Sequence, residues 1–277
     1  MQDQARASLK PLLLATICLI LSACASTGDK DPHSGWSAEH FYKEAKTALD
    51  DEDYRNAIEL YEKLEARYPF GKYANQAQLE IAFAYYKYDE PESAIAAVDR
   101  YIRLHPSDPH VAYALYLRGL VNYNRGIGFL ERFIPTDSSQ RDPGSSRHAF
   151  ADFSKLVTKY PDSEYAHDAR QRMIALRNNL AKYEVHAARY YIKRKAFLAA
   201  ANRGNYVVEK YQKTTAIPEA LEIMIHAYEE LGMDGLASDA RRVYQINYAD
   251  GLPDTGKPQS EETLSHQVLE FFELDKD

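Results

Sequence analysis

The sequence contains almost no cysteine. Of its 277 residues only Cys18 and Cys24 carry a thiol, and both lie close to the N-terminus. Cys18 falls inside an apolar leader of the kind that is removed from exported proteins, so only Cys24 remains in the mature chain. Once Cys24 is modified, the mature chain has no disulfide, no thiol nucleophile and no cysteine-based metal site.

The sequence also lacks a surplus of positive charge and the short motifs of common enzyme classes. Its 34 Lys and Arg residues are outnumbered by 41 Asp and Glu residues, so the net charge of −7 gives no reason to expect nucleic acid. There is no glycine-rich phosphate loop, no H-E-x-x-H and no G-x-S-x-G. The nine histidines stand at spacings that suit no metal site. We therefore predict a protein that is not an enzyme and binds no metal.

The first 23 residues have the pattern of a targeting segment. Arg6 and Lys10 precede an apolar stretch, Leu12 to Leu21, that is too short to span a bilayer. It ends in Leu21-Ser22-Ala23-Cys24, which resembles the lipobox of bacterial lipoproteins. This predicts a lipoprotein signal peptide at 1–23 and a covalent diacylglycerol and N-acyl lipid on Cys24, with no other cofactor. An ordinary signal peptide with a chance cysteine, or an uncleaved anchor, is the alternative.

The residues after Cys24 indicate where the chain is delivered. Ala25 and Ser26 follow the cysteine, without the aspartate that retains lipoproteins in the inner membrane. By resemblance to other bacterial lipoproteins, we expect the cell outer membrane, on its periplasmic face. Residues 24–35 are polar and have no periodicity, which predicts a flexible tether.

One pattern occurs three times in the sequence and predicts the fold. A small residue is followed by apolar or aromatic residues four and seven positions later, and then by proline. The copies are Ala57-x₃-Tyr61-x₂-Leu64-x₃-Tyr68-Pro69, Ala94-x₃-Val98-x₂-Tyr101-x₃-His105-Pro106 and Ala149-x₃-Phe153-x₂-Leu156-x₃-Tyr160-Pro161. The pattern is typical of the second helix of a tetratricopeptide (TPR) hairpin. Such hairpins stack into a solenoid that usually holds another polypeptide.

The spacing of equivalent alanines predicts about five hairpins. Ala57 and Ala94 are 37 residues apart, as are Ala200 and Ala237, whereas two intervals between Ala94 and Ala200 are longer, at 55 and 51 residues. The first excess falls between Asn124 and Arg147, where glycines and prolines predict a loop within the third hairpin.

The second excess lies in a stretch without glycine or proline, and there we predict one long helix over 163–194. The predicted fold is an all-α TPR solenoid at 36–248, in which this helix joins front repeats (36–161) to rear repeats (162–248). The last helix pair is expected at about 215–231 and 234–248. Ser37 is expected to cap the first helix.

Tyrosine is abundant, with 22 residues, and the repeat geometry places several rings on one face. The first helix of a TPR hairpin lines the concave groove. The positions that this geometry assigns to the groove are predicted to bind a peptide through apolar burial and ring packing: Tyr42, Phe83, Tyr86, Tyr113, Tyr116 and Tyr123. The alternative is that these rings only pack between neighbouring helices.

The tail at 249–277 begins with glycines and prolines that break the helical pattern. Within it, Leu264, Val268, Phe271 and Phe272 are spaced as an amphipathic stripe, which predicts a short helix. Such a helix either caps the end of the solenoid or docks on a partner.

Several segments together resemble the BamD family, the lipoproteins of the outer-membrane β-barrel assembly (BAM) machine. The resemblance covers Phe41 to Tyr248 and is carried by R67-YPFGKY-73, A84-YYK-87, R100-YIRLHP-106, Y116-LRGL-120, R141-DP-143, A149-FADFSKLV-157 and L180-AKYE-184. The acidic, phenylalanine-containing tail after Gly251 is not part of it.

The resemblance implies a non-enzymatic subunit for protein assembly and membrane insertion. It implies that the front repeats bind unfolded outer-membrane β-barrel proteins, through C-terminal strands that typically end in an aromatic residue. It implies that the rear repeats dock on a BamA-like barrel insertase with POTRA domains, and that other assembly lipoproteins are partners. The docking candidates that it suggests are Tyr191, Arg194, Arg241, Arg242 and Tyr244.

Two other functions remain open from the residues alone. One is a TPR lipoprotein adaptor of another envelope complex, serving peptidoglycan or cell division. The other is a periplasmic hydrolase that uses the groove as its active site, but the sequence shows no convergent acid or nucleophile for it.

Overall fold

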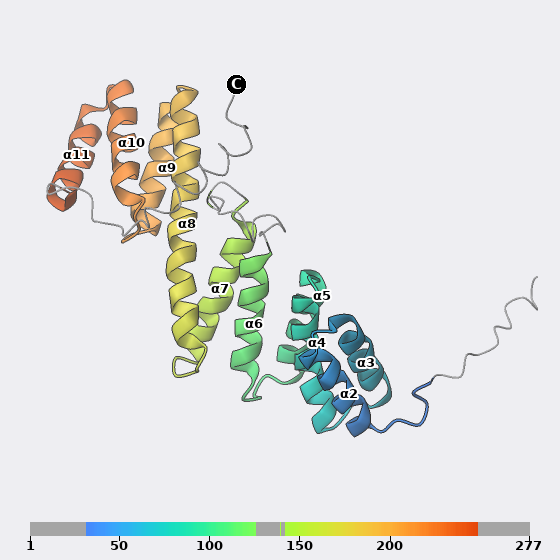
Figure 1. Ribbon diagram of the computed structural model, residues 1–277. Helices are drawn as coiled ribbons and strands as arrows, with labels where there is room; N and C mark the ends of the chain where they lie inside the picture. The colour runs from blue at the N-terminus through green and yellow to red at the C-terminus, as the bar shows by residue number, and fades with distance from the viewer. Residues whose placement is uncertain (1–31, 126–138, 140–141, 249–277) are drawn as a thin grey trace, which may run out of the picture.

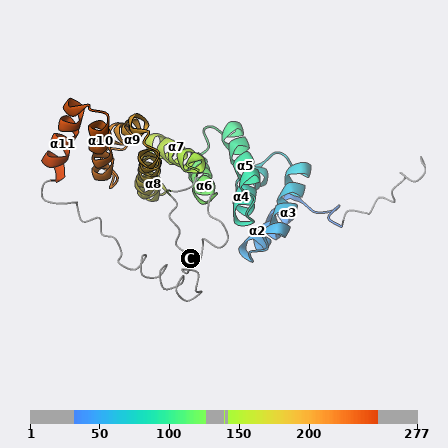
Figure 2. The same ribbon diagram turned by 90° about the horizontal axis from the view of Figure 1, so that it is seen from above.

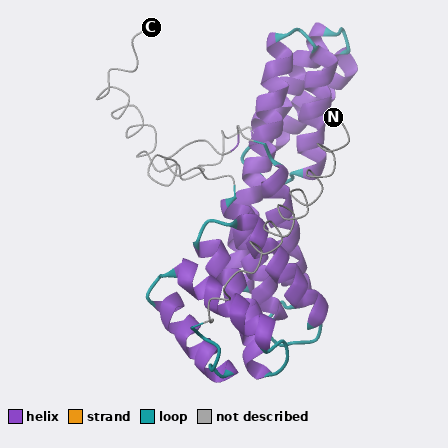
Figure 3. Ribbon diagram, turned by 90° about the vertical axis from the view of Figure 1, so that its right-hand side faces the viewer, coloured by secondary structure: helices purple, strands orange, loops and turns teal. Residues whose placement is uncertain are grey.

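The computed structural model describes residues 32–125, 139 and 142–248, and within these residues its regular structure is entirely α-helical (Figure 3). The helices are α2 (Ala38–Asp50), α3 (Tyr54–Arg67), α4 (Lys72–Lys87), α5 (Pro91–Leu104), α6 (Val111–Asn124), α7 (Gly144–Lys159), α8 (Ala166–Lys193), α9 (Phe197–Lys210), α10 (Ile217–Glu230) and α11 (Asp234–Tyr248). The predicted all-α TPR solenoid is confirmed.

Five helical hairpins follow one another along the array (Figure 1). Within each hairpin the two helices pack together, and the second helix then packs against the first helix of the next hairpin. Seen from above, the first helices α2, α4, α6 and α8 follow one side of the array, and the second helices follow the other (Figure 2). This stacking is what the repeated spacing in the sequence predicts.

The turn inside the hairpins is the same structure repeated. A residue with positive φ ends the first helix of four hairpins: Glu52, Asp89, Lys195 and Gly232. In each case the next residue's N–H bonds back to a carbonyl five residues earlier, as from Asp53 to Ala48 and from Met233 to Tyr228. This hydrogen bond is the signature of a Schellman C-cap, which satisfies carbonyls left open at the end of a helix.

Helix starts follow from the local sequence as well. The Ser37 side chain accepts a hydrogen bond from the His40 N–H at 3.2 Å, so the predicted cap is confirmed. Asp53 caps α3 in the same way through the N–H of Asn56. Pro91 opens α5, at a position where the missing N–H costs nothing.

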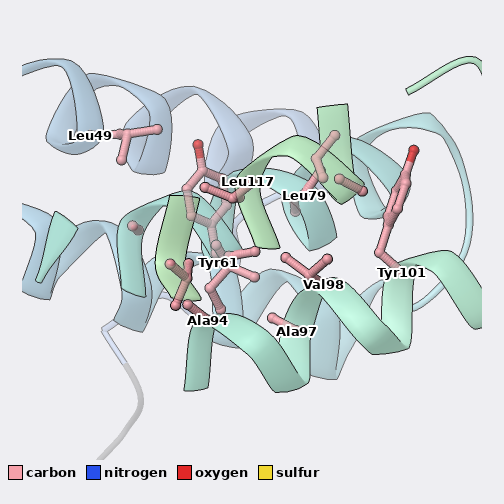
Figure 4. Packing of buried hydrophobic residues seen from close by; sticks show 14 of the residues in the cluster. Leu49, Tyr61, Leu79, Ala94, Ala97, Val98, Tyr101 and Leu117 are labelled. Carbon is pink, nitrogen blue, oxygen red and sulfur yellow. The ribbon is translucent and has the colours of Figure 1, made fainter. Parts of the chain in front are cut away.

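The front hairpins share one apolar core. The small residues of the repeated pattern, Ala57, Ala94 and Ala149, are fully buried, and the larger Tyr61, Val98 and Phe153 fill the space beside them. Figure 4 shows how Tyr61, Leu79, Val98 and Leu117 meet from four different helices. The repeated pattern thus marks the residues that lock neighbouring hairpins together.

A second core holds the rear hairpins together, and the two cores meet within α8. Leu176 packs in the front core, whereas Ala181 and Val185 pack in the rear core with α9, α10 and α11. At 28 residues, α8 is the longest of the described helices, and at 1.5 Å per residue it extends about 42 Å.

The predicted long helix is confirmed, although it begins three residues later than expected. Ser163 lies in a turn, where its carbonyl accepts from the N–H of Ala166 and its hydroxyl accepts from the N–H of Tyr165. The predicted last pair is confirmed as α10 and α11. In the third hairpin, α6 and α7 are separated by the expected insertion, of which Ser139 is described beside His186 of α8.

Several predictions fall on residues outside the described part of the structure. These are the signal peptide at 1–23, the lipid on Cys24, most of the tether at 24–35 and the tail helix within 249–277. Of the helices that are described, none combines the length and apolar character needed to cross a membrane.

Candidate functional site

The front hairpins form a pocket of about 560 Å³, which we call the front pocket. Its walls come from α2, α4, α5, α6 and the turns that precede α6 and α8. The residues that line it are Lys46, Leu49, Asp50, Lys72, Asn75, Gln76, Leu79, Glu80, Phe83, Tyr101, Asp108, His110, Tyr113 and Tyr165. A volume of this size accommodates a few side chains of a bound peptide.

Apolar and aromatic side chains line part of the front pocket. Leu49 and Leu79 are buried in the front core, and Phe83 and Tyr113 are half-buried beside them. The Tyr113 ring lies 5.5 Å from the ring of Tyr165, which precedes α8. The pocket therefore combines an apolar lining with rings at its edge, a surface that suits an apolar side chain.

Charged groups of both signs surround this apolar lining. Lys46 pairs with Asp50 at 2.7 Å, while the Lys72 ammonium lies 4.7 Å from the centre of the Tyr73 ring. Glu80 accepts hydrogen bonds from the phenols of Tyr42, at 2.9 Å, and Tyr61. Burial, reinforced by these bonds to Glu80, raises the pKa of both phenols, so they remain protonated donors.

The far end of the pocket is held by Asp108, in the turn between α5 and α6. Its carboxylate accepts from the backbone N–H of His110 at 2.7 Å and lies 2.8 Å from the His110 ring. Burial alone would raise the pKa of Asp108, but hydrogen bonds from His110 and Tyr101 lower it below its usual value. Asp108 is therefore an anion that orders the turn beside the pocket.

Of the six residues predicted for the groove, the structure places Phe83 and Tyr113 in the front pocket. Tyr42 is not among the lining residues, but its hydroxyl donates to the pocket residue Glu80 at 2.9 Å. Tyr86 lies next to Phe83, with ring centres 6.3 Å apart, and its hydroxyl accepts a hydrogen bond from Asn124. Whether these residues bind a peptide stays a prediction.

The remaining two groove candidates, Tyr116 and Tyr123, lie farther along the array and contact α8 or its turn. Tyr116 stacks on Tyr165 with ring centres 5.0 Å apart, and its hydroxyl donates to Asp168 at 2.7 Å. Arg172 donates to the same carboxylate and also lies 5.1 Å from the Tyr123 ring centre. These contacts pack both tyrosines between α6 and α8, and whether they also bind a peptide stays a prediction.

Sequence reasoning missed several residues of the front pocket, among them Lys72, Asp108, His110 and Tyr165. Except for Lys72, which is the first residue of α4, they lie in turns between hairpins. Their position in the sequence could have indicated them, because each lies at the start of the first helix of a hairpin or within three residues before it.

The five docking candidates divide into two groups on the rear hairpins. Tyr191 and Arg194 stand at the C-terminal end of α8, where Arg194 donates to the Tyr190 hydroxyl at 3.1 Å. Arg241, Arg242 and Tyr244 lie on α11, and Figure 1 shows α9 and α10 between the two groups. Arg241 and Arg242 pair with Glu229 and Asp239, while Tyr244 donates to Glu222 at 3.0 Å. The candidates do not form a single cluster.

Two buried carboxylates outside the pocket have structural partners. Asp152 of α7 accepts from Arg118 and Asn122 of α6, and Glu184 of α8 pairs with Arg203 of α9 and Arg147 of α7. Buried charges paired in this way join neighbouring helices. Among the residues that the structure describes, no group of three or more His, Cys, Asp or Glu side chains is arranged to hold a metal ion.

The sequence matches the model of a protein family described as "Outer membrane lipoprotein" (YfiO) over residues 35–243. It is also 46% identical over 243 residues to the outer membrane protein assembly factor BamD of Neisseria meningitidis serogroup A, covering 86% of this chain and 91% of that protein. The chain belongs to the BamD family. The BamD proteins of Vibrio cholerae and Haemophilus influenzae are 39% and 34% identical to it, over 82% and 86% of this chain and 94% and 90% of theirs.

Solved structures with TPR-like repeats show much weaker similarity to this chain. A putative kinesin light chain from Podosopora anserina with TPR-like repeats is 12% identical, covering 74% of this chain and 92% of that one, with a TM-score of 0.34. A similarity at this level carries no functional argument. The TPR arrangement is established here by the hairpins themselves.

Proposed function

We propose that this protein is a non-enzymatic scaffold of the outer-membrane β-barrel assembly machinery, which receives unfolded barrel proteins and passes them to a barrel insertase. Membership of the BamD family supports this role, because its relatives are named outer membrane protein assembly factors. The same relatives favour it over an adaptor of peptidoglycan synthesis or cell division.

The observation that carries the proposal is the front pocket. Its apolar residues and aromatic edge are surrounded by both charges, and a strand of a barrel protein alternates apolar and polar side chains. An aromatic residue at the end of such a strand would bury its ring against Phe83 and Tyr113. Lys72 stands at the pocket wall, where its ammonium lies near a ring and is available to a terminal carboxylate.

The rear hairpins are the part that we assign to docking on the insertase. Arg194, Arg241 and Arg242 are exposed there and are held in place by neighbouring side chains. Exposed arginines that are already ordered lose little conformational entropy when a partner binds. Capture of a β-barrel protein with periplasmic domains by the intact chain, solubilised in detergent, is the observation that this half of the proposal requires.

The lipid on Cys24 would keep the scaffold at the membrane where insertion takes place. The tether from Cys24 to the start of α2 at Ala38 is short, so the pocket stays within a few nanometres of the bilayer. A lipid anchor raises the effective concentration of the pocket near the insertase without any additional protein contact.

A peptide-binding measurement tests the pocket. Two half-buried aromatics on α4 form a matched pair: Phe83 lines the front pocket, and Tyr85 points to the other side of the helix, where its hydroxyl donates to Glu62. We expect Phe83→Ala to weaken binding of a fluorescent peptide with a barrel protein's C-terminal strand by at least about tenfold, since burying such a ring contributes roughly 1.5–3 kcal/mol.

Tyr85→Ala is the control for the same experiment. It removes a comparable ring from the same helix, so its effect on folding is similar, but peptide affinity should stay at the wild-type value. Equal affinities for wild type and Phe83→Ala, or equal losses in the two variants, would contradict binding in the front pocket. Circular dichroism of each variant establishes that the helices are intact.

A further inference from the structure

The front pocket leaves hydrogen-bond donors open, whereas its carboxylates are occupied. Each carboxylate that lines it already accepts hydrogen bonds or pairs with a lysine: Asp50, Glu80 and Asp108. Within the described part of the chain, four other polar side chains line the pocket without a hydrogen bond or an acidic partner: Lys72, Asn75, Gln76 and Tyr113. All four can donate a hydrogen bond. The groups left open in the pocket therefore suit an anionic ligand.

Three of these donors lie together near the start of α4. Lys72, Asn75 and Gln76 are at i, i+3 and i+4, so they share one face of the helix. Lys72 and Gln76 are exposed, and Asn75 is half-buried. The Tyr113 hydroxyl is the fourth donor, and it stays protonated because burial raises its pKa. An anion at this place would meet a charged lysine and neutral donors beside it.

The same face of α4 becomes apolar one turn later. Leu79 and Phe83 follow Lys72 at i+7 and i+11, and both line the pocket. Leu79 lies four residues beyond Asn75, which is about 6 Å along the helix. In the last residue of a peptide, the α-carboxylate and the side chain are bonded to the same Cα, so they lie within a similar distance of each other. A chain end with an apolar last residue therefore matches both parts of this face.

Carboxylates inside a chain match this face less well. The carboxylate of an aspartate or glutamate ends its own side chain, so it brings no apolar group to Leu79 and Phe83. An aromatic residue next to such an acid would supply the ring, but neighbouring side chains of an extended strand point to opposite sides. An internal aromatic residue without an acid would leave the Lys72 ammonium facing neutral peptide groups, which bind a charge more weakly than a carboxylate does.

We propose, on the basis of the peptide-binding function proposed above, that the front pocket selects the free C-terminal end of a chain. Lys72 and Asn75 bind the terminal carboxylate, and the apolar or aromatic side chain of the last residue packs on Leu79 and Phe83. Lys72 and Asn75 therefore determine specificity for a chain end, whereas Leu79 and Phe83 contribute affinity for any apolar peptide. The same sequence binds more weakly when it lies inside a longer chain.

Three fluorescent peptides that differ only at the chain end test this selection on the intact protein in detergent. One ends in phenylalanine with a free carboxylate, the second carries a carboxamide at that place, and the third continues for two serines beyond the phenylalanine. We expect the first peptide to bind about tenfold more tightly than either of the others, because hydrogen bonds to a charged group are stronger than those to a neutral one.

Two lysines of α4 provide a matched pair of variants. Lys72 and Lys87 are both exposed and lie 4.7 Å and 5.6 Å from the centre of a tyrosine ring, but of the two only Lys72 lines the pocket. Lys72→Met should reduce the preference for the free carboxylate to about twofold or less, and Lys87→Met should keep it at the wild-type value. Asn75→Leu should also reduce the preference, since it removes the amide donor at nearly constant shape. Circular dichroism of each variant establishes that the helices are intact.

Phe83→Ala separates selection of the chain end from peptide binding itself. It should weaken binding of the carboxylate and carboxamide peptides by the same factor and leave the ratio of their affinities unchanged. Equal affinities of the wild type for these two peptides, or a preference that survives Lys72→Met, would overturn selection of the chain end and leave the front pocket as a peptide site. Peptide binding that Phe83→Ala does not weaken would overturn both this selection and the proposed function.

Discussion

A close approach between α6 and α7 makes Gly119 a test of how the third hairpin is packed. A methyl group added at Gly119 would lie 2.4 Å, 2.6 Å and 2.9 Å from three ring carbons of Phe153. Phe153 is fully buried in the front core, so its ring has no free space to move into. Gly119→Ala therefore forces the two helices apart or pushes the ring off its preferred rotamer.

The expected size of the effect follows from two opposing contributions. Replacing glycine by alanine inside a helix stabilises it by about 1 kcal/mol, whereas overpacking a core costs about 1–3 kcal/mol. Because three contacts fall below 3.0 Å, we expect the upper end of that cost and a net loss of about 2 kcal/mol. For a domain of this size the loss lowers the melting temperature by roughly 4–8 °C.

Thermal unfolding followed by circular dichroism measures this difference, and Gly235→Ala is the matched control. Gly235 is also a helical glycine, in the first turn of α11, but a methyl group there would meet nothing within 4 Å. It should leave the melting temperature unchanged or raise it slightly. A Gly119→Ala protein as stable as the Gly235→Ala protein would refute the packing argument.

A double variant locates the clash. If the added methyl group collides with Phe153, then Phe153→Leu should partly relieve the effect of Gly119→Ala, and the combined loss of stability should be smaller than the sum of the two single losses. Additive losses would mean that the strain lies elsewhere in the helix pair.

Two further predictions concern the helix α8 and the lipid anchor on Cys24. Burial would raise the pKa of Asp168, but hydrogen bonds from Arg172 and Tyr116 lower it below its usual 3.8. The charged carboxylate therefore stabilises the fold above about pH 4, and this stabilisation is lost as the pH falls through the lowered pKa of the folded state. The difference in melting temperature between wild type and Asp168→Asn should therefore be larger at pH 7 than at pH 2.5, and a difference that is the same at both pH values would contradict this. Cys24→Ala should release the folded protein from the outer membrane in cell fractionation, and a membrane pool that stays complete even after a high-salt wash would argue against lipid anchoring.

Much of the fold could be predicted from the sequence because each hairpin of a repeat protein packs only against its neighbours, so its packing residues recur at a regular spacing. Ala57, Ala94, Ala149 and Ala200 are each fully buried, and their spacing in the sequence was enough to predict the number and order of the hairpins. Apolar residues that recur on a helical period, in a stretch without glycine or proline, predicted that α8 continues without a break from the front to the rear hairpins.

The front pocket was harder to predict, for a physical reason. Helical periodicity says which face a ring occupies but not whether a residue from another hairpin covers it, as Tyr165 covers Tyr116. Phe83 and Tyr116 were both predicted to line the groove, yet of these two only Phe83 lines the front pocket. The Tyr116 hydroxyl instead donates to Asp168, which lies 52 residues further along the chain. Contacts of this range depend on the angle between successive hairpins, which the pattern of one hairpin does not contain.

The uninterrupted α8 sets a fixed offset between the two ends of the molecule. The first half of α8 packs in the front core and its second half packs in the rear core. The number of residues in α8 therefore sets the distance and the rotation between the front and the rear hairpins. One extra residue in its middle would swing the rear hairpins by about 100° and advance them about 1.5 Å, whereas seven would restore their facing within about 20° and move them about 10.5 Å. The length of α8 therefore determines both the separation and the relative orientation of the two groups of hairpins. We expect proteins of this family to tolerate insertions of whole helical turns in α8 far better than insertions of single residues.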